Sequence, residues 1–187
     1  MRLGVLGSTR GTNLAAIFAA IQDKQLNASV EIVISNKSDA FILERAASYQ
    51  IPALFINPKD LTREQYDELI SLELKKHRVD FIILIGYMRI LSAAFVNQWP
   101  DKIINIHPSL LPLYAGKMDL DVHHAVLDAK EKETGCTVHY VEEVVDAGKI
   151  LLQKRCVVLP EDTPESLKAR VQALEGPALV EAIELLM

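Results

Sequence analysis

The run from Asn105 to Pro112 carries the side chains best suited to chemistry in this chain. Asn105 and His107 stand two residues apart at the end of a β-branched stretch that predicts a buried strand, so both side chains point to the same side. An imidazole titrates near neutral pH and can take or give a proton, and a carboxamide can donate to a developing oxyanion. The pair therefore indicates acid–base catalysis, although a loop histidine satisfied by backbone groups explains it equally well.

An acidic segment, residues 142–148, lies between two apolar strand patterns and predicts a hairpin-type connection. Its last carboxylate is Asp146. A carboxylate close to an imidazole raises the imidazole pKa and orients its tautomer. The sequence leaves open whether Asp146 meets His107 or only closes the turn.

The segment 7–13 leaves the first predicted strand and opens a helix. Backbone N–H groups at a helix start form an anion site when glycine permits close approach. The segment matches neither the dinucleotide fingerprint nor the P-loop, so a plain β–α turn is an equally good interpretation.

Strand-like and helical patterns alternate along the first two thirds of the chain, which favours β–α–β units and a parallel sheet. Strands are expected at 2–7, 30–35, 53–56, 80–85, 102–106, 136–141 and 150–157, and helices at 13–24, 39–49, 62–78, 92–97 and 122–130. The predicted fold is α/β: one Rossmann-like domain over residues 1–187, with a twisted, mostly parallel sheet, an antiparallel edge and helices on both faces.

Two capping patterns mark helix starts. Thr62 with Gln65 forms a capping box, and Thr163 precedes a final helix that has Pro164 at its first position. The pair Gly176-Pro177 is expected to break or kink that final helix.

Composition narrows the function classes. A net charge of −5 and a pI near 5.5 argue against a nonspecific nucleic-acid or membrane-surface binder. No apolar run approaches the ~20 residues of a membrane span, and the N-terminus reads as a strand rather than a signal peptide. Cys136 and Cys156 form no Cys-x-x-Cys pattern, which indicates reduced thiols and a cytoplasmic protein.

The remaining histidines indicate no metal site. His123 and His124 are adjacent, so on a helix they point about 100° apart and cannot chelate one ion from one face. His77 belongs to a basic helix end, and His139 shares a strand face with Thr137 and is interpreted as structural.

The chain resembles the phosphoribosylglycinamide formyltransferases, a family of folate-dependent enzymes of purine synthesis. The resemblance covers nearly the whole chain, and its matching motifs lie at 11–13, 35–37, 86–91, 105–112, 146–148 and 172–175. It implies formyl transfer from 10-formyltetrahydrofolate to the amino group of glycinamide ribonucleotide, with these two small molecules as partners and no metal, nucleic acid or membrane. The sequence leaves monomer and homodimer open.

The resemblance also assigns residues to roles. It implies that Asn105, His107 and Asp146 are catalytic. It implies that Gly11, Thr12 and Asn13 hold the ribonucleotide phosphate and that Glu175 binds the ribose hydroxyls. The residues that it assigns to the folate are Arg63, Met88, Arg89, Ile90, Leu91, Asn105, Glu142, Glu143, Val144 and Val145.

Three alternatives compete with this function. Methionyl-tRNA formyltransferase would carry a further C-terminal domain and a more basic surface. Formyltetrahydrofolate deformylase usually has an additional N-terminal regulatory domain. A catalytically silent α/β nucleotide-binding module is the alternative from another class, and the joint presence of Asn105, His107 and Asp146 argues against it.

Overall fold

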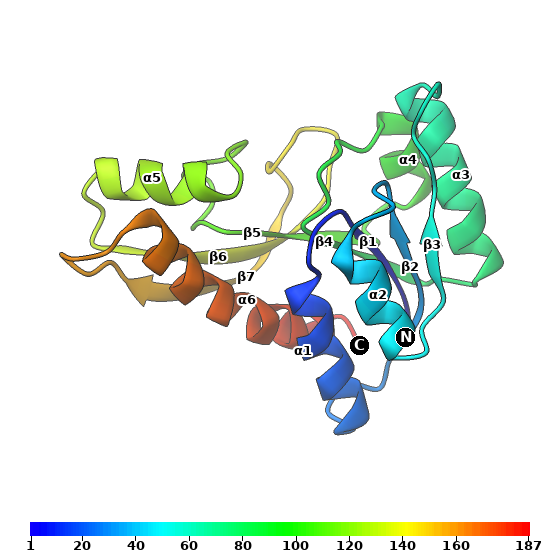
Figure 1. Cartoon of the computed structure of the whole chain (residues 1–187), viewed down its shortest axis with the longest axis horizontal. Helices are drawn as coiled ribbons and strands as arrows, with labels where there is room; N and C mark the ends of the chain where they lie inside the picture. Colours follow the sequence, from blue (N-terminus) through cyan, green and yellow to red (C-terminus); the bar gives the residue numbers. More distant parts are fainter.

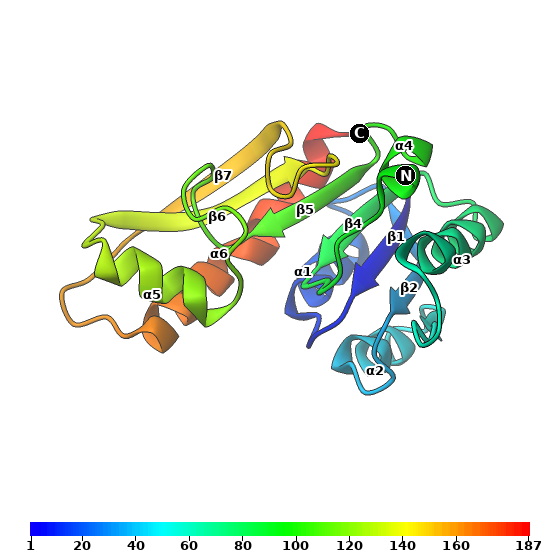
Figure 2. The ribbon, with the colours of Figure 1, turned by 90° about the horizontal axis from the view of Figure 1, so that it is seen from above.

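Seven strands form one sheet in the order β3-β2-β1-β4-β5-β6-β7 in the computed structural model, which describes all residues 1–187. The strands are β1 (Arg2–Gly7), β2 (Ser29–Ser35), β3 (Ala53–Phe55), β4 (Phe81–Ile85), β5 (Ile103–His107), β6 (Glu133–Tyr140) and β7 (Ile150–Val157). Strands β1 to β5 pair in parallel, whereas β5–β6 and β6–β7 pair antiparallel. Figure 2 shows β1, β4 and β5 running in one direction and β6 returning beside them.

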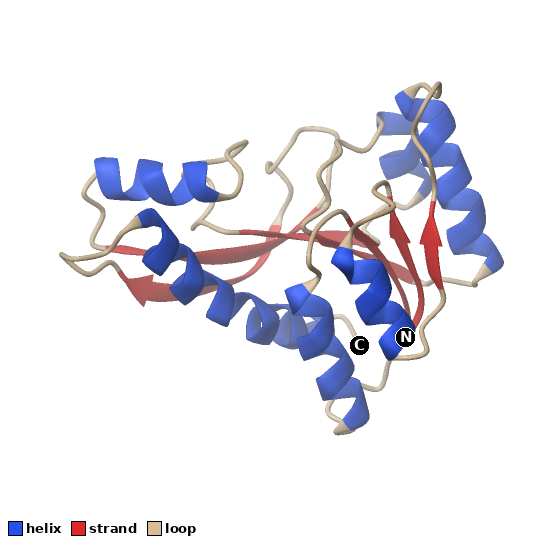
Figure 3. Ribbon diagram, in the orientation of Figure 1, coloured by secondary structure: helices blue, strands red, loops and turns tan.

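Helices cover both faces of the sheet (Figures 1 and 3). They are α1 (Thr12–Gln22), α2 (Phe41–Ser48), α3 (Arg63–Lys76), α4 (Ala93–Gln98), α5 (Leu120–Asp128) and α6 (Pro164–Leu185). A core of 24 buried residues joins one sheet face to α1, α2 and α6, and a second core of 14 joins the other face to α3 and α4. The predicted three-layer α/β arrangement with an antiparallel edge is therefore confirmed.

The sequence of each strand matches its place in the sheet. Central β4 reads Phe-Ile-Ile-Leu-Ile and is buried at every position, because helices cover both of its faces. Edge strand β7 is only partly buried and contains charged side chains such as Lys154 and Arg155. Thr62 and Gln65 form the predicted capping box of α3, and Thr163 caps α6.

The strand order reverses between β1 and β4, since β2 and β3 lie on one side of β1 and the later strands on the other. Open α/β sheets bind ligands at the carboxyl ends of the strands beside such a switch point. The loops that follow β1 and β4 leave the sheet there, and β5 ends at the same edge with His107.

Of the predicted break or kink at Gly176-Pro177, the break is wrong, because α6 is helical without interruption from Pro164 to Leu185. Packing outweighs the lost backbone hydrogen bond of Pro177. A Cβ atom on Gly176 would lie 2.7 Å from the Cβ of Ala16, so the glycine lets α6 press closely on α1. The residues that follow, among them Leu179 and Ile183, are fully buried and hold the second half of the helix in place.

The other expected boundaries agree with the structure to within about three residues, the usual uncertainty of helix and strand ends. No helix combines the length and apolar character required to cross a membrane.

Candidate active site

Asn105, His107 and Asp146 lie together at the carboxyl end of β5. The Nδ1 atom of His107 is 3.3 Å from Oδ2 of Asp146, and its Nε2 atom is 3.3 Å from the carbonyl oxygen of Tyr114. The Asp146 backbone is left-handed, with φ of 56°, a conformation that aspartate tolerates better than most residues. Because its carboxylate lies next to the His107 ring, the alternative that Asp146 only closes the turn of residues 142–148 is wrong.

A second histidine completes this cluster. Strands β5 and β6 pair so that Asn105 lies opposite His139 and His107 lies opposite Thr137. The Nε2 atom of His139 is 3.2 Å from Nδ2 of Asn105 and 3.6 Å from Oδ1 of Asp146. The interpretation of His139 as merely structural missed this contact, because only the antiparallel register reveals it.

Burial controls the charge of both imidazoles. Burial lowers the pKa of His107, and the neighbouring Asp146 carboxylate and Tyr114 carbonyl offset only part of that effect. The pKa of His139 is lowered for the same reason, with Tyr140 and Asp146 acting in the opposite direction. Asp146 thus acts in the predicted direction, but both rings favour the neutral form at neutral pH.

The loop that follows His107 is anchored from β6 and β7. The hydroxyl of Thr137 donates to the carbonyl of Ser109 at 2.6 Å and accepts from the N–H of Leu111 at 3.0 Å. The side-chain amide of Gln153 donates to the Leu111 carbonyl at 2.9 Å. These bonds fix the Pro-Ser-Leu-Leu-Pro segment that follows His107 at the end of β5.

The turn between β1 and α1 has the geometry of an open helix start. Gly11 occupies the N-cap position with φ of 64°, and no side chain caps the helix. The first N–H groups of α1, at Thr12 and Asn13, therefore remain available for an anion. A side chain at position 11 would also collide with Ile42, since its Cβ would lie 2.3 Å from Cγ1 of that residue.

Glu175 reaches this turn from α6. The side-chain amide of Asn13 donates to Oε2 of Glu175 at 2.8 Å. Burial raises the pKa of Glu175, and the hydrogen bond from Asn13 and the charge of Lys168 reduce that rise. Lys168 also pairs with Asp119, so α6 is tied to the loop before α5.

Ser8 links the loop after β1 to the loop after β4. Its backbone N–H donates to the carbonyl of Gly86 at 3.1 Å, and its hydroxyl accepts from the N–H of Met88 at 2.9 Å. The hydroxyl donates in turn to Oδ1 of Asn36. Ser8 was not among the predicted site residues. The one signal in the sequence was its position in the segment 7–13, which also contains Gly11.

The predicted folate segments present apolar side chains to solvent. Met88 and Ile90 are 42% and 54% exposed, and Val144 and Val145 are 68% and 46% exposed. Leu91 differs, because its side chain is buried in the core shared with α3 and α4.

The charged residues assigned to the folate have different surroundings. The Arg89 guanidinium packs over the ring of Tyr66, 4.5 Å from its centre. Arg63 is the first residue of α3, and Glu143 accepts from the Asn97 side chain at 3.0 Å. Glu142 is exposed.

Comparison with known proteins decides the family. The formyl transferase family model matches residues 1–183. The chain belongs to the formyl transferase family. It is 42% identical over 175 residues to the phosphoribosylglycinamide formyltransferase of Haemophilus influenzae, covering 93% of this chain and 81% of that protein. Glycinamide ribonucleotide transformylase 1 from Symbiobacterium toebii has the same fold, with a TM-score of 0.93 at 39% identity, covering 98% of this chain and 85% of that one.

A longer relative shares the same formyl transferase segment. The trifunctional purine biosynthetic protein adenosine-3 of Drosophila melanogaster is 45% identical over 189 residues, which is 100% of this chain but 14% of that protein. The chain thus spans a small part of the trifunctional relatives that it matches. The predicted resemblance is confirmed, and the predicted function agrees with the names of these relatives.

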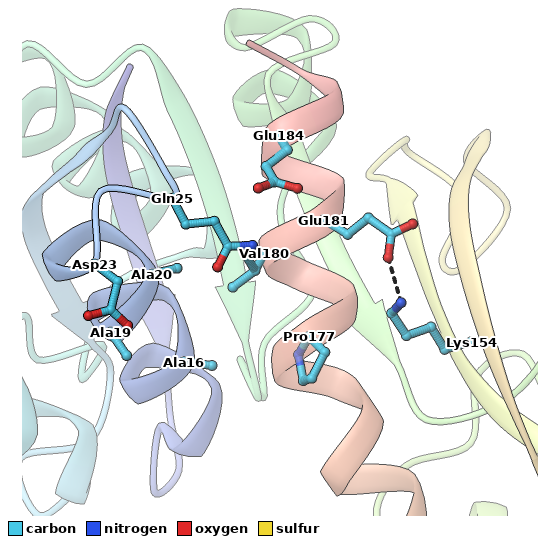
Figure 4. Close-up of a pocket in the computed structure, with 10 residues that line it drawn as sticks. All are labelled: Ala16, Ala19, Ala20, Asp23, Gln25, Lys154, Pro177, Val180, Glu181 and Glu184. Carbon is cyan, nitrogen blue, oxygen red and sulfur yellow. Dashed lines mark hydrogen bonds and ion pairs between the residues drawn. The ribbon is translucent and has the colours of Figure 1, made fainter.

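This formyl transferase chain also has a groove between α1 and α6 (Figure 4). Small side chains of α1, such as Ala16 and Ala20, form one side of the groove. On the other side Glu181 of α6 forms an ion pair with Lys154 of β7 at 2.5 Å. None of the predicted site residues lines this groove.

Proposed function

We propose that this chain transfers the formyl group of 10-formyltetrahydrofolate to the primary amine of glycinamide ribonucleotide. The observation that carries the proposal is the cluster of Asn105, His107 and Asp146 beside the switch point of a formyl transferase fold. Two open loops flank this cluster, one suited to an anion and one lined by exposed apolar side chains. These are the features that a phosphorylated amine and a flat heterocycle require.

The chemistry needs little more than placement and proton transfer. The folate donor supplies an activated formyl carbon, whose oxygen gains negative charge as the amine attacks. Asn105 lies at the strand end with its amide facing the cluster, where an N–H can stabilise that charge. Holding both substrates in one cleft supplies the entropic part of the rate gain.

His107 acts as the proton carrier in this proposal. The ring favours the neutral form, so it can take the proton that the attacking amine must lose. Once charged, its two N–H groups face two acceptors, the Asp146 carboxylate and the Tyr114 carbonyl. These acceptors stabilise the cation until the proton passes to the departing nitrogen.

The ribonucleotide binds at the turn between β1 and α1. The N–H groups of Thr12 and Asn13 receive its phosphate, and the Gly11 conformation keeps the helix start open. Glu175 is already positioned by the bond from Asn13, and its free oxygen accepts from the ribose hydroxyls.

The folate lies between two apolar walls. Met88 and Ile90 form one wall, and Val144 and Val145 form the other, while Glu142 and Glu143 flank the second wall. The acidic end of the folate lies toward Arg63 and Arg89. In the free protein the Arg89 Nε atom is buried without a hydrogen-bond partner, which suits a carboxylate ligand.

The remaining parts of the proposal concern the whole molecule. We place residues 1–187 in one formyltransferase domain and the protein in the cytoplasm, which the free Cys136 and Cys156 thiols suit. Monomer and homodimer both remain compatible with the cleft, because every residue assigned to it comes from one chain.

A two-substrate assay tests the proposal. Purified protein is given 10-formyltetrahydrofolate with and without glycinamide ribonucleotide, and formylated ribonucleotide, tetrahydrofolate and formate are measured. We expect tetrahydrofolate to form only when the ribonucleotide is present and in equal amount with its formylated product. Formate release without the ribonucleotide would favour the deformylase alternative, and no turnover with intact binding would favour the silent module.

A further inference from the structure

His139 is fully enclosed and touches three polar groups of the candidate site. Its Nδ1 atom lies 2.8 Å from the carbonyl oxygen of Tyr140, and its Nε2 atom lies 3.2 Å from Nδ2 of Asn105. Asp146 approaches the same Nε2 atom at 3.6 Å, beyond hydrogen-bond distance. The residue is 2% exposed, so water cannot substitute for any of these contacts.

The Tyr140 carbonyl fixes the tautomer of this ring. A carbonyl oxygen only accepts, so Nδ1 of His139 must carry the proton in that short bond. In the neutral ring Nε2 is then an acceptor. The only donor within hydrogen-bond distance of Nε2 is the Asn105 amide nitrogen, so this atom must face His139.

The orientation of Asn105 matters because a carboxamide has a donor end and an acceptor end. With one N–H held by His139, the second N–H of the same nitrogen is directed elsewhere and remains free for the cleft. If the amide were turned over, its oxygen would face the bare Nε2 atom, and two acceptors would repel each other. His139 therefore selects one of the two possible orientations.

We propose that His139 is a positioning residue for formyl transfer, because its Nδ1-protonated ring orients the Asn105 amide so that a free N–H faces the developing oxyanion. This inference rests on the proposed function. The chain of contacts runs from the Tyr140 carbonyl through His139 to Asn105, across the pairing of β6 with β5. It accounts for a second buried histidine near the end of β6.

Nitrogen-15 NMR of the histidine rings tests the tautomer without any substrate or variant. Long-range proton–nitrogen spectra distinguish a protonated ring nitrogen from a bare one, and a His139→Gln sample assigns the signals. We expect a protonated Nδ1 and a bare Nε2 for His139 at neutral pH. A protonated Nε2 would overturn the inference, because the ring would then donate to Asp146 or to the Asn105 oxygen.

Kinetics test the consequence for turnover. His139→Leu removes the acceptor, so Asn105 loses its orientation, and we expect kcat to fall about 10- to 100-fold, less than the ~10²–10³ typical of deleting an oxyanion donor. KM for either substrate should change little. His139→Gln places an amide oxygen near the position of Nε2 and should restore most of kcat, which a purely structural role does not predict.

Two further variants keep the outcomes distinct. In an Asn105→Ala background the His139→Leu change should have almost no additional effect, since its action passes through Asn105. Thr134→Val, a buried change in the same strand without contact to the cluster, should leave kcat unchanged. If the wild type is active and the His139→Leu variant has the same kcat, this inference alone is overturned. If the wild type is inactive, the proposed function is overturned.

Discussion

The phosphate turn and the imidazole cluster are built in opposite ways. The turn consists of neighbours in sequence, Gly11 to Asn13, and its shape follows from one left-handed glycine and the start of a helix. The cluster joins Asn105 and His107 to His139 and Asp146, from segments separated by more than thirty residues. The first is a local structure, whereas the second exists only because β5 and β6 pair in one particular register.

The two regions differ in exposure as well. Thr9, Arg10 and Thr12 are exposed around the turn, where water competes for any anion. The imidazoles are almost fully enclosed, so their charge is costly and each contact has a large effect. Changes in the turn should therefore act on the binding of one substrate, and changes in the cluster should act on turnover.

The largest expected effect is that of removing the proton carrier. We expect His107→Ala to lower kcat by about two to four powers of ten, the usual contribution of a general acid or base. KM should change much less, since the residue contributes to proton transfer rather than to binding. Steady-state kinetics measures the change, and thermal unfolding checks that the variant is folded.

His124→Ala is the matched control for that variant. His124 is exposed on α5 and contacts no member of the cluster, so its removal should leave kcat unchanged. Near-normal turnover of a folded His107→Ala enzyme would remove His107 from the mechanism.

The turn should show the opposite kinetic pattern. We expect Gly11→Val to raise KM for the ribonucleotide about 10- to 100-fold, as the loss of a charge-assisted hydrogen bond does, and to change KM for the folate much less. Calorimetric titration with each ligand separates the two. Equal losses for both ligands would indicate general disruption of the loop.

Steric strain must be separated from loss of the phosphate site in that variant. A side chain at position 11 meets Ile42, so Gly11→Val also pushes α2 away from the turn. Ile42→Val alone relieves part of that contact without touching the turn, and should leave both KM values near those of the wild type. The Gly11→Val, Ile42→Val pair should regain only a small part of the stability, because valine keeps Cβ and a γ carbon at position 42 and lacks only Cδ1, and its ribonucleotide KM should remain high.

The same contrast explains what the sequence could predict. The strands, the capping box of Thr62 and the shared side of Asn105 and His107 follow from period and local chemistry, and the structure has them. The position of Asp146 could be suggested but not decided, because nothing local brings residue 146 to residue 107. His139 was misinterpreted for the same reason, since its partners become visible only with the register of β5 and β6.

Packing accounts for the other differences. The continuity of α6 through Pro177 depends on Gly176 meeting Ala16 of another helix, and no helix propensity includes that contact. The neutral preference of His107 likewise depends on burial, which outweighs the Asp146 carboxylate. The sequence shows which groups are present, but the depth at which they lie is a property of the folded chain.

A smaller effect concerns the link between Asp146 and the two rings. Asp146→Asn keeps the size and removes the charge, so we expect the pKa of His107 and that of His139 to fall further. A tenfold weaker affinity of a ring for its proton corresponds to about 1.4 kcal/mol of lost interaction. NMR titration of both rings measures the change. If the reaction requires neutral His107, the acidic limb of the pH–rate profile should move to lower pH.

Glu143→Gln is the control for this substitution, because it removes a charge from the same loop while the side chain bonds to Asn97 instead of an imidazole. Its ring titrations should match those of the wild type. Unchanged values in Asp146→Asn would show that the carboxylate does not act on His107, and Glu142 would be the next candidate.

The smallest effect extends the contrast between buried and exposed groups to stability. His123 is buried on α5, next to exposed His124, and burial lowers its pKa to about 4. The unfolded chain binds a proton near pH ~6.5, where the folded protein does not, so the unfolded state holds more protons in this window. The contribution of His123 to the free energy of unfolding should be fully present above pH ~6.5. It should decrease toward pH ~4 by up to about 1.4 kcal/mol per pH unit.

His123→Gln should flatten that decrease, and His124→Gln should leave it unchanged. Urea unfolding at several pH values measures both slopes. The difference from wild type isolates the histidine, because Asp67 and Glu175, whose pKa values burial raises, act in the opposite direction and are common to all three proteins. Equal slopes in wild type and His123→Gln would show that the buried ring titrates as it does in the unfolded chain, and the difference between the two faces of α5 would then lie in packing alone.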